Sequence, residues 1–276
     1  MFKIFIHAVL ILGAAVILMP YFWMFCTSFK SYPELVKINS SLFKDFLPEK
    51  WLFENYEIAW KTDNSAIFRG LINTLTVVIP SLILGIFSST ISAYAFAKMK
   101  FPGRDKIFFG LICMMMIPGV VTMVPSFIIF RHLSWLDTYL PMMVPAMFGS
   151  IAAVFFLRQF FMTIPNELIE SAHIDGAGEF TTFVRIVVPC AKTAITTQTV
   201  LGFMGGYNDY LGPLLYLETP EKFTLQLALN NLMGFNGDQW NLIFAGAMMA
   251  LIPSVIIFFL AQNFFIEGIA NSGLKV

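Results

Sequence analysis

Six long stretches with almost no charged residues set the strongest limit on how this chain can fold. Their apolar cores contain no Asp, Glu, Lys or Arg, except for Asp209 in the fifth. Each is long enough to cross the hydrocarbon core of a bilayer as an α-helix, which takes about 20 residues. Because a spanning segment must satisfy its own backbone polar groups, we predict an all-α integral membrane protein with six transmembrane helices in a single domain, residues 1–276. The predicted spans cover about residues 4–29, 70–97, 107–130, 138–160, 191–217 and 240–266.

The overall composition agrees with this class and argues against others. Only 12% of the residues are charged, whereas soluble domains carry about 25%. The formal net charge is zero, so the chain lacks the basic footprint that nucleic-acid binding needs. The histidines and cysteines are scattered without metal-ligand or redox spacing, so we predict no metal site and no catalytic residue.

Basic residues in the short loops predict the orientation. The segment KMKFPGRDK at residues 98–106 carries four basic residues, and basic short loops stay in the cytoplasm. With six spans, both termini and the loop at residues 161–190 are then cytoplasmic, and residues 30–69 form a long external loop.

The loop at residues 161–190 is polar enough to lie outside the membrane. Pro165 predicts the first turn of a helix, with Thr163 or Asn166 as capping residues. Gly176 and Gly178 should end or turn that helix. The predicted apolar sides are Leu168, Ile169, Ala172 and Ile174 in this helix and Phe180, Phe183, Val184, Val187 or Val188 in a second one. From these residues alone, an amphipathic connector and a docking element for a partner are both open.

The same loop resembles the signature of binding-protein-dependent ABC importer permeases, which is Glu-Ala-Ala, three residues, Gly, nine residues and Ile-x-Leu-Pro. Here the segment reads ESA from Glu170, Gly176 and IVVP from Ile186. The spacing is kept, while Ser171 and Val188 replace alanine and leucine. The resemblance implies that the loop is a coupling loop that docks on an ATPase. The residues implied in coupling are Glu170, Ser171, Ala172, Asp175, Gly176, Ala177, Ile186 and Pro189.

Three further segments resemble the carbohydrate branch of these permeases, close in pattern to the second permease subunit of maltose-type transporters. They are AYAFAKMKFPGR at residues 93–104, YNDYLGPLLYL at residues 207–217 and the tail FFIEGIANSGLKV. The tail resemblance implies an ATPase contact at Gly273, Leu274 and Lys275, although Val276 replaces the usual glycine.

The resemblance implies a subunit of an ATP-driven importer for a sugar or oligosaccharide in a bacterial-type inner membrane. Its implied partners are a homologous second permease, two ATP-binding subunits and an external solute-binding protein. The chain has no G-x-x-x-x-G-K-[ST] motif, so ATP and Mg²⁺ belong to the partner ATPase and this chain binds no cofactor itself. The resemblance thus implies a transport subunit and not an enzyme.

Asp209 marks a candidate substrate pathway. Charged residues at membrane depth are costly and usually face a cavity or a partner. Aromatic and amide groups suit a sugar, which gives the candidates Tyr207, Asn208, Asp209 and Tyr210. A purely structural role for Asp209 is the alternative. Glycerol phosphate is an alternative solute, and a self-sufficient secondary transporter is an alternative function that would need more intramembrane carboxylates.

Overall fold

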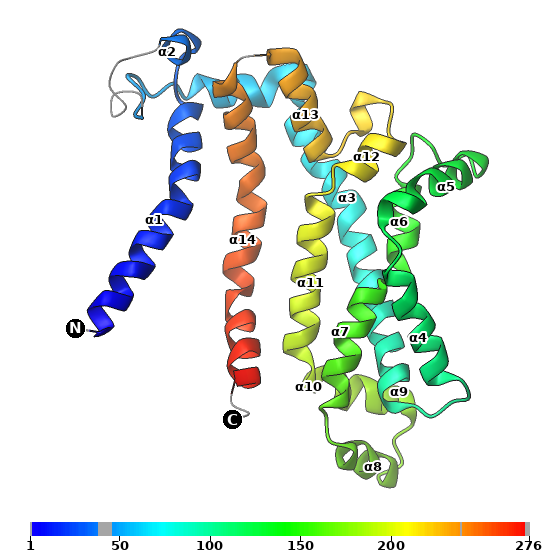
Figure 1. Ribbon diagram of the computed structural model, residues 1–276. Helices are drawn as coiled ribbons and strands as arrows, with labels where there is room; N and C mark the ends of the chain where they lie inside the picture. The colour runs from blue at the N-terminus through cyan, green and yellow to red at the C-terminus, as the bar shows by residue number, and fades with distance from the viewer. Residues whose placement is uncertain (1, 38–45, 238, 274–276) are drawn as a thin grey trace. The chain divides into compact units, whose positions relative to one another are not determined.

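The computed structural model describes residues 2–37, 46–237 and 239–273, and the side chains within them except at 62–65, 235–236 and 263–273. All regular structure in these residues is helical (Figure 1), which confirms the all-α prediction. The helices are α1 (Phe2–Ser28), α2 (Tyr32–Val36), α3 (Glu54–Lys98), α4 (Arg104–Met115), α5 (Gly119–His132), α6 (Leu140–Met147), α7 (Ile151–Met162), α8 (Asn166–Ile174), α9 (Glu179–Thr182), the π-helical turn η1 (Phe183–Val187), α10 (Val188–Cys190), α11 (Lys192–Tyr207), α12 (Leu211–Tyr216), the 3₁₀ turn η2 (Pro220–Lys222), α13 (Leu225–Asn236) and α14 (Trp240–Gly273).

The described helices include four that are long and apolar enough to cross a membrane unbroken. These are Phe2–Ser28, Ala66–Lys98, Leu140–Met162 and Trp240–Gln262. Two further candidates are bent pairs, α4 with α5 at 95° and residues 179–190 with α11 at 79°. The six predicted spans are therefore reached only if each bent pair counts as one.

Two predicted spans differ from the helices observed. The predicted span 107–130 is broken between α4 and α5, because Pro118 lacks an N–H and disfavours helical geometry at Ile117. The predicted span 191–217 contains a helix that ends at Tyr207, and α12 follows as a separate helix.

The chain divides into two compact units. The first unit consists of residues Met1–Ile72 and Phe223–Ser254. Within it, Asn55 is 5% exposed and donates from Nδ2 to the backbone oxygens of Ser28 and Lys30, both at 2.8 Å. These bonds satisfy carbonyl groups left over at the end of α1 and hold that end against the start of α3.

The second unit consists of residues Asn73–Lys222 and Val255–Val276. Within it, α8 lies at one end, and α5 and α12 lie at the opposite end (Figure 1). Its apolar core consists of Ala93, Tyr94, Phe108, Val154, Leu157, Phe161, Ile164, Phe183, Val187, Ala191 and Ala194. This core brings the end of α3 together with α4, α7 and the loop at residues 161–190.

The junction of α6 and α7 packs closely on α3 in the same unit. Gly149 at this junction has φ of +87°, and a Cβ there would lie 3.0 Å from the backbone oxygen of Gly85. The backbone N–H of Ser150 donates to Ser89 Oγ at 3.2 Å. Small residues thus allow the junction and α3 to approach closely. The hydroxyl of Ser89 accepts a backbone N–H at the start of α7, where the helix is interrupted.

Candidate functional site

The coupling loop, residues 161–190, begins its first helix one residue later than the sequence predicted. Pro165 occupies the N-cap position of α8, and no side chain caps the helix. Thr163 Oγ1 instead donates to Phe160 O at 2.7 Å, and Asn166 Oδ1 accepts from Lys98 Nζ at 2.8 Å. The predicted capping roles of Thr163 and Asn166 are wrong, because both side chains bind groups outside the first turn of α8.

Gly176 is the residue that turns the chain at the end of α8. Its φ is +82°, a left-handed conformation that glycine adopts without steric cost. The N–H of Ala177 donates to Ala172 O at 2.9 Å, and the N–H of Gly176 donates to His173 O at 3.0 Å. This pair of bonds is a Schellman motif, which gives the glycine of the signature a physical reason.

Only one row of α8 faces the protein. Ala172 is 7% exposed and Ile169 packs against the core. Leu168 is 45% exposed and Ile174 is 86% exposed, so these two members of the predicted apolar side are not covered by the described part of the chain. Of the residues implied in coupling, Glu170, Ser171, Asp175 and Gly176 are exposed and Ala177 is half-buried. The loop therefore presents a surface with both apolar and acidic side chains.

The second half of the loop is anchored in the core. Phe183 is 4% exposed and Val187 is fully buried, and both lie in the π-helical turn η1. Phe180 at 67% and Val184 at 44% exposure point outward, so this part of the predicted apolar side is not covered by the described residues. Turns of this kind often occur at functional sites. In the signature, Ile186 is half-buried and Pro189 is exposed.

Two side chains of α3 hold the coupling loop, and the sequence analysis did not find them. Tyr94 Oη donates to Glu179 Oε2 at 2.7 Å. Lys98 Nζ donates to Ile164 O at 2.6 Å and to Asn166 Oδ1 at 2.8 Å. Both lie in the segment AYAFAK, but nothing in that segment alone indicates the partner of either side chain.

The predicted pathway residues lie at the break between α11 and α12 instead of inside one long span. Tyr207 is 1% exposed and stacks on Phe203 with ring centroids 5.4 Å apart. Asn208 Nδ2 donates back to Met204 O at 2.8 Å. Asp209 Oδ1 accepts the N–H of Gly212 at 3.2 Å, and Tyr210 is half-buried. Asp209 thus has at least a local structural role at the start of α12.

The predicted tail contact falls largely outside the described residues. Gly273 is the last residue of α14, and Leu274 and Lys275 lie outside the residues that the structure describes.

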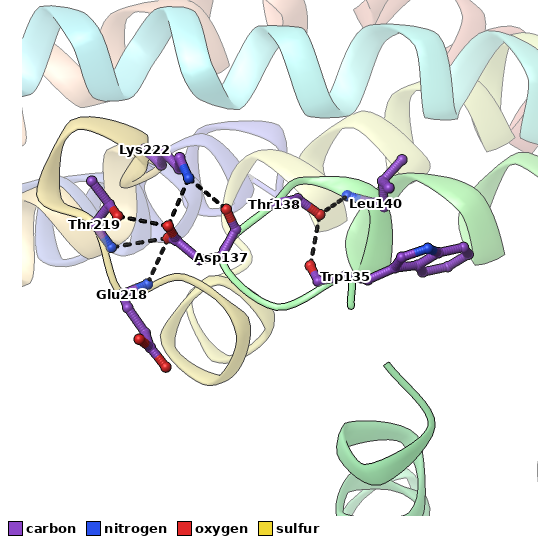
Figure 2. A network of polar contacts seen from close by, with 7 residues as sticks. All are labelled: Trp135, Asp137, Thr138, Leu140, Glu218, Thr219 and Lys222. Atoms are coloured by element: carbon purple, nitrogen blue, oxygen red, sulfur yellow. Dashed lines mark hydrogen bonds and ion pairs between the residues drawn. The ribbon is translucent and has the colours of Figure 1, made fainter. Parts of the chain in front are cut away.

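An unpredicted polar network ties the turn before α6 to the turn after α12 (Figure 2). Asp137 Oδ1 accepts from the N–H groups of Glu218 and Thr219 at 3.1 and 3.0 Å. Asp137 Oδ2 accepts from Thr219 Oγ1 and Lys222 Nζ, both at 2.6 Å. The hydrogen bond from Lys222, followed by those from Thr219, holds the pKa of the Asp137 carboxyl well below its usual range.

The comparisons with known proteins identify the family. The family described as "Binding-protein-dependent transport system inner membrane component" matches residues 81–270, which include the whole coupling loop. The chain belongs to this family. It is therefore a multi-pass membrane protein and a permease subunit of a binding-protein-dependent transport system, not an enzyme.

Two relatives of this permease cover almost its whole length. The arabinooligosaccharides transport system permease protein AraQ of Bacillus subtilis (strain 168) is 32% identical over 94% of this chain and 90% of its own. The sn-glycerol-3-phosphate transport system permease protein UgpE of Escherichia coli O1:K1 / APEC is 33% identical over 98% of this chain and 96% of its own. These matches confirm the importer permease that the signature predicted.

The fold of the permease is also similar to that of a solved transporter. A chain in the crystal structure of a bacterial ABC transporter involved in the import of the acidic polysaccharide alginate has a TM-score of 0.83, with 22% identity over 96% of each chain. At this level of identity the likeness concerns the fold. It shows that the fold of this chain is a known one.

Proposed function

We propose that this permease imports a sugar or oligosaccharide and is driven by ATP hydrolysis in a separate subunit. It would form half of the translocation pathway beside a homologous second permease. Two ATP-binding subunits would dock on the cytoplasmic side, and an external solute-binding protein would deliver the solute. ATP and Mg²⁺ belong in this proposal to the ATPase subunits, and the permease itself carries out no covalent chemistry.

The observation that carries the proposal is the exposed surface of the coupling loop. Glu170 and Asp175 are exposed acids on and beside α8, and Ile174 is an 86% exposed apolar side chain next to them. A Schellman motif at Gly176 fixes the end of the helix, so the surface is pre-organised before any partner binds. An apolar anchor beside carboxylates suits a groove that contains a basic residue, as the ATPase of such an importer would supply.

The two relatives suggest two classes of solute, an oligosaccharide and a glycerol phosphate. The charge of Asp209 favours the oligosaccharide. AraQ is described as a permease for arabinooligosaccharides and UgpE as one for sn-glycerol-3-phosphate. The candidate pathway of this chain contains a carboxylate, Asp209, which would repel a phosphate group. Glycerol phosphate is therefore the second candidate, supported by the match to UgpE over 98% of this chain.

The proposed orientation follows the basic segment at residues 98–106. Both termini and the coupling loop would lie in the cytoplasm, and the Asp137 network would lie outside. Cysteine-accessibility labelling at Glu170→Cys and Glu218→Cys tests it, since only the second should react with an impermeant reagent in intact cells.

The function is tested by purifying the permease in mild detergent from cells that also express its accompanying transport proteins. We expect a nucleotide-binding subunit to co-purify, and uptake by reconstituted vesicles to require ATP and the binding protein. Competition between a labelled arabinooligosaccharide and labelled glycerol 3-phosphate then identifies the solute class. Full transport by the purified chain alone would contradict the proposal and would favour a self-sufficient secondary transporter.

A further inference from the structure

The coupling loop is anchored in the apolar core through Phe161, Ile164, Phe183 and Val187, but α8 itself makes few apolar contacts. Ala172 is the only residue of α8 that is buried. The remaining attachment of this helix comes from the segments immediately before and after it. Both of these segments are bonded to the same helix, α3.

Tyr94 holds the segment after α8. The tyrosine is 4% exposed, and its hydroxyl donates to Glu179 Oε2 at 2.7 Å. Glu179 is the first residue of α9. Its other carboxylate oxygen lies 3.8 Å from Nε2 of His173 in α8. A short bond from a buried hydroxyl to a carboxylate is among the stronger hydrogen bonds in proteins.

Lys98 holds the segment before α8. Its ammonium group donates to Ile164 O at 2.6 Å and to Asn166 Oδ1 at 2.8 Å. Asn166 is the first residue of α8. Because Lys98 follows Tyr94 by four residues, both side chains project from the same face of α3.

The same end of α3 is also fixed to α7 and α4. Arg158 of α7 donates from Nε to Phe96 O at 3.2 Å. Its guanidinium carbon lies 4.1 Å from the ring centroid of Phe108 in α4, within the range of a cation–π contact. The end of α3 is therefore bonded to α7 and, through Arg158, linked to α4.

We propose that Tyr94 and Lys98 are positioning residues that carry a displacement of α8 into α3. One bond would leave α8 free to rotate about it, whereas one bond on each side fixes both its position and its orientation. A push on α8 then moves α3 instead of tilting α8 on the surface. This inference rests on the proposed function, because it assumes that an ATPase pushes on α8.

The test uses the complete complex of permease, ATPase and binding protein in vesicles. The measured quantity is the amount of solute imported per ATP hydrolysed, with whichever of labelled arabinooligosaccharide and labelled glycerol 3-phosphate the wild-type complex imports. The variants are Tyr94→Phe, Lys98→Met and the two combined, and Lys98→Arg is the conservative variant. Lys100→Met and Tyr32→Phe are matched controls, because both side chains are exposed.

We expect the double variant to keep its ATPase and its hydrolysis while the import per ATP falls about tenfold, the scale of losing one hydrogen bond to a charged group. In each single variant the import per ATP should fall less than in the double variant. Lys98→Arg should retain most of the wild-type import per ATP, and the two control variants should match wild type.

An unchanged ratio in the double variant would overturn the inference, and so would loss of the ATPase from the purified complex, since that would make the two residues merely structural. If the wild-type complex neither binds an ATPase nor imports a solute, the proposed function fails and the inference fails with it.

Discussion

The coupling loop and the Asp137 network are both polar, yet their carboxylates are used in opposite ways. Asp137 accepts hydrogen bonds on both carboxylate oxygens, from Glu218, Thr219 and Lys222. Glu170 is exposed and accepts none from any residue that the structure describes. Both regions belong to the second unit.

In the proposed function, this difference separates a group that stabilises the fold from a group that would bind a partner. A carboxylate with several short bonds has its partners already and contributes to the shape of a turn. An exposed carboxylate on a helix that is fixed at both ends gains nothing from its own chain. The proposed docking role gives this carboxylate a partner on another subunit, whereas a simple connector would leave it in water.

The largest expected effect is that of Glu170→Lys. Reversing this charge should lower uptake at least about 100-fold, since removing one partner of a desolvated ion pair costs ~3 kcal/mol or more. Insertion into the membrane should be unchanged because Glu170 bonds to no described residue. Uptake in vesicles measures the loss of transport, and co-purification measures how much ATPase stays bound to the permease.

Glu218→Lys is the matched charge reversal at the other end of the unit. Figure 2 shows the Glu218 carboxylate pointing away from Asp137, so this variant should retain co-purification of the ATPase. A Glu170→Lys permease that assembles and transports normally would refute the docking role of α8.

A smaller effect should come from the turn that ends α8. Gly176→Ala introduces a side chain at φ of +82°, which costs ~1–2 kcal/mol for an L-residue, so import should fall about tenfold. Gly178→Ala is the control, because Gly178 has φ of −77° and no atom lies within 4 Å of the added Cβ at either glycine. The two variants therefore differ in the backbone conformation at the substituted glycine and not in steric crowding.

If Gly176→Ala and Gly178→Ala transport equally well, the Schellman geometry does not matter for docking. Limited proteolysis of the loop in the two variants provides a second readout, since loss of the turn should make only the Gly176→Ala loop more sensitive to cleavage.

The sequence predicted the class of fold and the coupling loop because both are local patterns. Apolar runs reveal α1 and α14 directly, and the spacing from Glu170 to Pro189 lies within one segment of the chain. The break at Pro118 was missed because prolines are tolerated inside many membrane helices. Nothing in the composition of residues 107–130 says whether the helix bends by 95° there.

The contacts between distant segments could not be predicted. Tyr94 and Glu179 are 85 residues apart, as are Asp137 and Lys222. A single sequence contains the donors and the acceptors but not the packing that brings them together. The residues of α8 that are covered could not be predicted for the same reason, since Leu168, Ile169 and Ile174 are equally apolar and only the neighbouring helices decide which is covered.

Asp209→Asn should have a moderate effect on uptake. It tests whether Asp209 acts in transport, as proposed for Glu170, or stabilises the fold, as Asp137 does. Asparagine keeps an oxygen that can accept the N–H of Gly212, so the turn before α12 should survive. We expect uptake to fall about threefold through loss of the charge, with unchanged yield of folded permease. Equal losses of uptake and of folded permease would assign Asp209 a structural role like that of Asp137.

The smallest effect on transport should come from Asp137→Asn, which instead lowers stability. Asparagine also tolerates the φ of +54° at this position, so the change removes mainly the charge. The Asp137 side chain is 27% exposed and that of Lys222 is 42% exposed. With this much solvent screening, we expect a loss of about 1 kcal/mol in the free energy of unfolding at neutral pH, measured on the purified permease.

The pH dependence of that loss tests whether it comes from the charge. The pKa of Asp137 is lowered in the folded protein, chiefly by the hydrogen bond from Lys222. A carboxyl group of this kind contributes stability above the unfolded-state pKa of about 4, and the contribution disappears as the pH falls through the folded-state pKa. The difference in stability between wild type and Asp137→Asn should therefore be constant from neutral pH down to about 5 and shrink below about 4. Lys222→Met should produce the same pH dependence, because it removes the donor that lowers the pKa most. A difference that stays constant into strong acid would mean that the network acts through its shape alone, and the contrast between a paired Asp137 and an unbonded Glu170 would then not be one of charge.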